Sequence, residues 1–119
     1  MTQHLLYADW NKRDSTLVSR TVFEKDLRSN YKEMLAFGIK PHQDNVFLPP
    51  YEWYNADIAR WTKEMNFILI NFSSGTRSNA DYTYPEMNSR YVGTEEIYQS
   101  ILQYEKLHGM NGFILLIHI

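Results

Sequence analysis

The stretch that decides the fold runs from Asn45 to Phe72 and reads NVFLPPYEWYNADIARWTKEMNFILINF. It starts with a short apolar run, Val46–Leu48, which predicts a strand, and two prolines that cannot donate to a sheet end it. Asn55 then predicts a helix N-cap, with apolar residues following at helical spacing. Phe67–Phe72 is apolar almost throughout, which predicts a strand buried on both faces.

Helices are also predicted on both sides of this stretch. Thr21 and Glu24 have the spacing of a capping box, which predicts that a helix starts there and ends near Gly38. A third helix is predicted between Thr94 and Gly109, and a last apolar strand over Phe113–Ile119. The order is therefore helix, strand, helix, strand, helix, strand.

This alternation predicts an α/β fold with a mainly parallel sheet. Three parallel strands would leave two exposed sheet edges, so we expect a tendency to self-associate. A closed (β/α) barrel needs roughly 200 residues or more, whereas this chain has 119. We therefore expect a fragment of a distorted TIM-like (β/α) barrel.

Composition excludes several classes of function. The net charge of −2 does not indicate the excess of basic residues that nucleic-acid binding requires. The longest apolar run is Phe113–Ile117, far below the ~20 residues of a membrane-spanning helix. Without cysteine, any metal would need His and carboxylate ligands. Met1–Trp10 shows no secretory signal, which leaves the compartment open.

Chemically useful side chains follow the predicted strands, where ligands bind in α/β sheets. Each also has a structural interpretation. His118, at a strand's carboxyl end, is either a satisfied core histidine or a catalyst. Pro50 and Tyr51 form a turn that ends a strand, or a rigid bend that aims a backbone N–H at a substrate oxygen. Asp81, taken in isolation, is a turn former.

The runs Leu48-Pro49-Pro50-Tyr51 and Leu115-Leu116-Ile117-His118 resemble the later motifs of the polysaccharide deacetylases, the NodB-homology enzymes of carbohydrate esterase family 4. His4-Leu5-Leu6-Tyr7-Ala8-Asp9-Trp10 and Ser78-Asn79-Ala80-Asp81-Tyr82-Thr83 are similar to one subgroup of that family. The resemblance covers essentially all of residues 1–119. It implies a distorted barrel that removes acetyl groups from N-acetylated sugars with a divalent metal, zinc by preference.

The resemblance also implies roles for single residues. His118 matches the general acid toward the leaving amine, and Asp81 corresponds loosely to the carboxylate that orients it. Tyr51, after Pro50, matches the residue whose backbone N–H holds the oxyanion. The remaining matches are Leu116 in the acetyl methyl pocket, His4 as a metal ligand, and Trp53, on chemical grounds, as a wall of the sugar groove.

Two family features are missing from the sequence. The Thr-Phe-Asp-Asp motif, which supplies the general base and a metal ligand, occurs nowhere, and Met1-Thr2-Gln3 stands where the first metal histidine belongs. A lone imidazole cannot hold zinc usefully. We therefore expect a partial deacetylase domain over residues 1–119, inactive alone, whose metal binds only if the missing ligands are supplied.

Three functions remain open. The first is a hydrolase completed by its missing N-terminal half or by a partner. The second is a non-catalytic carbohydrate-binding remnant that keeps the aromatic groove. The third is an unrelated small α/β module, ranked last because no glycine-rich phosphate loop follows any predicted strand.

Overall fold

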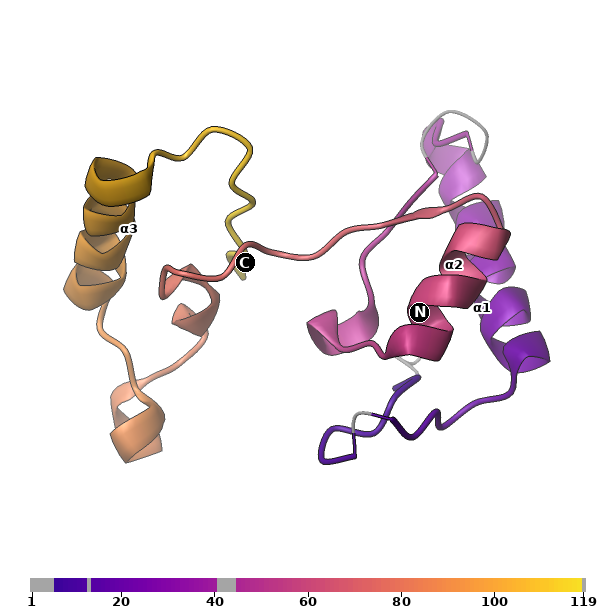
Figure 1. Cartoon of the computed structure of the whole chain (residues 1–119), viewed down its shortest axis with the longest axis horizontal. Coiled ribbons are helices and arrows are strands. Elements are labelled where there is room, and N and C mark those ends of the chain that lie inside the picture. Colours follow the sequence, from indigo (N-terminus) through magenta and orange to yellow (C-terminus); the bar gives the residue numbers. More distant parts are fainter. Residues whose placement is uncertain (1–5, 13, 41–44, 119) are drawn as a thin grey trace. The chain divides into compact units, whose positions relative to one another are not determined.

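A computed structural model describes residues 6–12, 14–40 and 45–118 of the chain. The chain divides into two units, Met1–Asn71 and Phe72–Ile119. Figure 1 shows helices α1 and α2 in the first unit and helix α3 in the second. No helix among the described residues is long and apolar enough to cross a membrane.

The first unit holds a strand–helix–strand arrangement. Strand β1 (Val46–Phe47) and strand β2 (Ile68–Leu69) pair in parallel, with Val46 opposite Ile68 and Phe47 opposite Leu69. Helix α2 (Ala56–Glu64) connects them, and the Asn55 side chain caps it by accepting from the Ile58 N–H at 3.1 Å. The predicted α/β character and the Asn55 cap are confirmed, although both strands are shorter than expected. The prediction that the Phe67–Phe72 strand is buried on both faces is wrong, because Ile68 is 58% exposed.

Helix α1 (Arg20–Met34) precedes the sheet and begins earlier than the sequence indicated. Its cap is Ser19, whose hydroxyl accepts from the Val22 N–H at 3.3 Å, so the prediction of a start at Thr21 is wrong. Two hydroxyl residues lie close together here, and the one whose backbone is extended becomes the cap. A 3-10 turn follows, and Gly38 closes it with φ of 84°.

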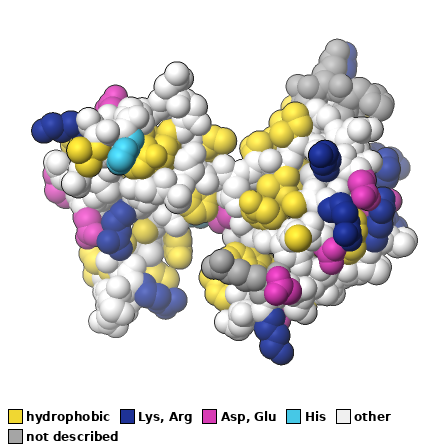
Figure 2. Space-filling view, viewed as in Figure 1, with side chains coloured by type: hydrophobic (Ala, Val, Ile, Leu, Met, Phe, Trp, Pro, Cys, Tyr) yellow, Lys and Arg dark blue, Asp and Glu magenta, His cyan; other side chains and the backbone are white. Residues whose placement is uncertain are grey.

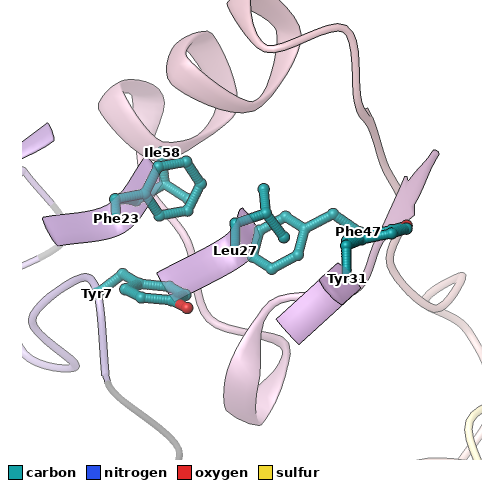
Figure 3. Close-up of a cluster of buried hydrophobic side chains, with 6 residues drawn as sticks. All are labelled: Tyr7, Phe23, Leu27, Tyr31, Phe47 and Ile58. Carbon is teal, nitrogen blue, oxygen red and sulfur yellow. The ribbon is translucent and has the colours of Figure 1, made fainter. Parts of the chain in front are cut away.

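An aromatic cluster forms the core of the first unit (Figure 3). Its buried members come from both helices, from β1 and from the N-terminal segment: Tyr7, Phe23, Leu27, Tyr31, Phe47 and Ile58. The fully buried Phe23 ring lies edge-on to Tyr7 at 5.0 Å and to Phe47 at 5.7 Å between ring centroids. Such edge-to-face packing stabilises the core beyond the burial of apolar area.

The surface of the first unit carries charges of both signs, as Figure 2 shows. Arg20 binds Glu24 on its own helix at 2.6 Å and Glu64 on α2 at 2.7 Å. Both pairs lie at the surface, where solvent screens the charges, so they contribute little to stability.

The second unit is built around helix α3 (Thr94–His108), which ends at Gly109 as predicted. Two 3-10 helices, Ser78–Ala80 and Pro85–Arg90, precede it. Gly75 approaches the Tyr104 ring so closely that a Cβ would lie 2.3 Å from it, and its φ of 121° also requires glycine.

The third predicted strand, Phe113–Ile119, is wrong for the described residues 113–118, which form no strand. Ile114 accepts a hydrogen bond from the Ser73 N–H, but its own N–H donates to the Ser73 side chain. Likewise, the His118 N–H donates to the Asp81 carboxylate. Side chains thus take hydrogen bonds that a neighbouring strand would otherwise make.

The cap of α1 gives a direct test. Ser19→Ala should lower the free energy of unfolding by about 1 kcal/mol, because the Val22 N–H loses its acceptor. Thr21→Ala is the matched control and should change it by less than about 0.5 kcal/mol. Urea denaturation followed by tryptophan fluorescence measures this, since Trp10, Trp53 and Trp61 all belong to the first unit. A larger loss in Thr21→Ala would contradict the assignment.

Candidate functional site

Asp81 holds His118 with both carboxylate oxygens. Oδ1 lies 2.7 Å from the imidazole Nδ1, and Oδ2 accepts from the His118 backbone N–H at 2.6 Å. An ionised carboxylate can only accept, so Nδ1 carries the hydrogen and the other ring nitrogen, Nε2, is left to exchange a proton. The two residues are 37 positions apart in the chain and are brought together within the second unit.

Local structure explains where Asp81 stands. It ends the 3-10 helix Ser78–Ala80, and its N–H donates to the Ser78 carbonyl at 3.3 Å. Ser78 itself is buried, which anchors the turn. The carboxylate is therefore presented from a fixed backbone rather than from a freely moving loop.

The imidazole is packed on one side and accessible to solvent. The ring of Tyr82 meets the His118 ring edge-on at 5.0 Å between centroids. The side chain of His118 is 41% exposed, against 19% for Asp81. An oriented, accessible imidazole is the arrangement that proton transfer to a bound substrate requires. Sequence reasoning assigned no role to Tyr82. Its position directly after the candidate residue Asp81 could have indicated that it lies near His118.

The pKa of Asp81 reflects this pairing. Burial by itself raises the pKa of the carboxyl, but the hydrogen bonds from the His118 ring and backbone N–H, together with the His118 charge, outweigh burial and lower it. The ionised form of Asp81 is therefore the form that the fold stabilises.

Leu116 is half-buried two positions before His118. A mostly apolar cavity of about 260 Å³ lies in the same unit, and Asp81, Ile117 and the α3 residues Ile97 and Ile101 help to line it. Leu116 is not among its lining residues. The role that the resemblance implies for Leu116 stays a prediction.

The Pro50–Tyr51 segment belongs to the first unit and forms a strained turn after β1. Pro50 opens a short 3-10 helix, Pro50–Glu52, in which both Tyr51 (φ 58°) and Glu52 (φ 56°) have left-handed backbone. Non-glycine residues of this kind cost about 1–3 kcal/mol each, and such strain clusters at functional sites. The turn is held by the Glu52 N–H donating to Pro49 and by the Asn71 amide donating to the Glu52 carbonyl, at 2.9 and 2.8 Å.

Trp53 lies just beyond this turn and stacks on Trp10. The two rings are 4.6 Å apart between centroids with an interplanar angle of 24°. The Trp53 indole N–H donates to the Asp9 carbonyl at 2.9 Å, which fixes the ring, while Trp10 is 59% exposed. Sequence reasoning assigned no role to Trp10, although this residue ends the His4–Trp10 run that is similar to the deacetylase subgroup.

The described residues hold no group of three or more His, Asp or Glu side chains that could bind a metal. His4, the ligand that the resemblance implies, lies outside the described residues. Among the residues that the structure describes, no set of zinc ligands is therefore present.

The candidate residues fall into two sets, each within one unit. Pro50, Tyr51 and Trp53 belong to the first unit. Asp81, Leu116 and His118 belong to the second.

Comparison with known proteins gives no relative: no family model, curated protein or solved structure matches the chain.

The Asp81 carboxyl should titrate below its ordinary pKa, and His118→Ala should raise that pKa, because the ring hydrogen bond is lost. Since the folded pKa is depressed, the associated stability is fully present above the unfolded value of about 3.9 and is lost as pH falls through the folded value. Carboxyl ¹³C NMR titration measures the shift. His108→Ala, on α3, is the control and should leave it unchanged; an equal shift in both variants would contradict the pairing.

Proposed function

We propose that this chain is part of a carbohydrate deacetylase, a fragment of the distorted (β/α) barrel of the polysaccharide deacetylases. In this proposal His118 is the general acid and Asp81 is its positioning residue. The observation that carries the proposal is the pair of hydrogen bonds that the Asp81 carboxylate accepts from the ring and the backbone N–H of His118. The sequence motifs around Pro50–Tyr51 and Leu116–His118 support it.

The chemistry follows from what amide hydrolysis requires. When the C–N bond of the tetrahedral intermediate breaks, the nitrogen must gain a proton, because an amide anion is too basic to leave. An imidazolium donates that proton from Nε2 and becomes neutral, while Nδ1–H stays bonded to Asp81. General acid catalysis of this kind contributes roughly 10²–10⁴ in rate.

Tyr51 would act through its backbone rather than its ring. Prolines at 49 and 50 and the hydrogen bonds around Glu52 restrict the turn that carries the Tyr51 N–H. A preorganised N–H donor stabilises the oxyanion without reorganisation at the moment of reaction. The strain of the left-handed backbone at Tyr51 supports such a role.

The proposal assigns activation of water to residues that this sequence does not carry. The Thr-Phe-Asp-Asp motif is missing from it. A segment with that motif, in the same natural product or in a partner, would supply the base. Reading the gene upstream of Met1 and weighing the native product tests this: a mass well above 14.2 kDa with the motif restored supports it, and 14.2 kDa without any partner contradicts it.

Acetate release from an N-acetylated chitooligosaccharide by the natural gene product is the direct assay. His118→Ala should lower kcat by about 10²–10⁴ with little change in KM, because the residue acts on the leaving group. Asp81→Asn should lower kcat in the same direction, because the imidazole loses its acceptor. His108→Ala is the matched control and should retain full activity. Wild-type activity in His118→Ala would refute the general-acid role.

A second function is favoured by the stacked Trp10–Trp53 pair. An exposed indole face held rigidly by a partner ring is a surface on which the apolar face of a sugar ring can pack. The chain would then be a non-catalytic carbohydrate-binding remnant of the same fold.

The binding hypothesis makes a separate prediction. The chain alone should bind chitooligosaccharides by isothermal titration, with no effect of a chelator, and Trp53→Ala should abolish binding. Tyr98→Ala, an exposed aromatic residue on α3, is the control and should bind normally. Chelator-sensitive binding, or unchanged binding in Trp53→Ala, would argue against it.

A further inference from the structure

A cavity of about 600 Å³ lies in the first unit at the amino ends of β1 and β2. Helix α1, the end of α2 and the residues before both strands line it. Its volume falls within the range of small-molecule sites in proteins. The Tyr51 turn, in contrast, follows the carboxyl end of β1, so this cavity is separate from the proposed deacetylase residues.

Two positively charged side chains line the cavity. Arg28 and Lys32 line it from adjacent turns of α1, four residues apart and therefore on one face of the helix. Neither has an ion-pair partner among the described residues. The carboxylate that also lines the cavity, Glu64, is bound to the Arg20 guanidinium at 2.7 Å. The lining residues that the structure describes thus carry two positive charges and one negative charge, which is a net positive charge.

Aromatic rings form the apolar wall. Tyr31 is 4% exposed, and its ring lies 4.7 Å from that of Phe67 between centroids. The Tyr31 hydroxyl donates to the Val46 carbonyl, which fixes the ring against the sheet. Met65 and Leu35 extend this wall. A preformed apolar surface of this kind suits a planar ligand.

The polar rim beside this wall is also fixed. Asn66 has left-handed backbone (φ 62°), and its carbonyl accepts a hydrogen bond from the Asn45 side chain. The turn between α2 and β2 is thereby held in one conformation at the edge of the cavity. The same cavity is thus lined by two cations, by an aromatic wall and by the fixed amide groups of its rim.

We propose that this cavity binds a small organic anion: a ring-sized apolar body that carries a carboxylate or a phosphate group. The ring packs against Tyr31 and Phe67, and the anionic group binds Arg28 and Lys32. Arginine suits such groups because its planar fork of donors matches their oxygens. This site is independent of the proposed deacetylase chemistry.

Benzoate and phenyl phosphate are the probes, and benzyl alcohol is the neutral analogue. Two-dimensional ¹H–¹⁵N NMR of the whole chain should show saturable shifts of the Lys32, Asn66 and Phe67 amides with at least one anion. Benzyl alcohol should bind at least about tenfold more weakly, since it lacks the charge-assisted bonds. Absence of saturable shifts with both anions would overturn the proposal.

Charge-matched variants distinguish binding in this cavity from nonspecific electrostatic attraction of the anion to the protein surface. Arg28→Gln with Lys32→Gln should weaken anion binding by about tenfold or more. Lys25→Gln with Lys63→Gln removes the same net charge outside the cavity lining and should leave affinity within about twofold. Glutamine keeps helix propensity, so both variants should fold. Equal weakening in both variants would overturn the proposal.

Discussion

The position of the C-terminal segment in the second unit depends on the Asp81 carboxylate, whose two oxygens both accept hydrogen bonds from His118. The ring bond orients the imidazole, and the backbone bond fixes the end of the extended segment that carries it. The same segment is held near its start by hydrogen bonds between Ser73 and Ile114. The segment is thus fixed at two points without belonging to a sheet. Loss of Asp81 would release both the ring and the backbone of His118.

In the first unit, the aromatic core provides the rigidity that the strained turn requires. Phe23 contacts rings from the N-terminal segment, β1 and α2, which ties these parts together. The left-handed residues Tyr51 and Glu52 follow β1 directly and persist because this surrounding structure fixes them. The Asn71 side chain, from just after β2, adds a hydrogen bond to the same turn.

Local signals in the sequence predicted the helices well and the sheet less well. Asn55 and Gly109 mark helix ends because capping depends on neighbouring residues alone. Ser19 replaces Thr21 as a cap because two hydroxyl residues compete and the backbone conformation selects between them. The apolar run at 113–118 is not a strand, because a strand also needs a partner, and apolar sequence does not supply one.

The candidate site also depends on contacts between residues that are distant in the sequence, which local patterns do not predict. The motif resemblance pointed to Asp81 and His118, whereas composition and spacing gave no reason to join residues 37 positions apart. Tyr82 and Trp10 were missed because each matters only through a ring contact made in the folded chain. Arg28 and Lys32 were not singled out in the sequence either, because only the folded chain shows that both line one cavity.

The tautomer of neutral His118, measured by long-range ¹H–¹⁵N NMR, tests directly whether Asp81 orients the imidazole. Because Nδ1 faces an acceptor-only carboxylate at 2.7 Å, we expect the Nδ1–H form in the wild-type chain. Asp81→Ala should return His118 to the Nε2–H form that free imidazole side chains favour. Nε2–H in the wild type, or the same tautomer in both proteins, would contradict the claim that Asp81 orients His118.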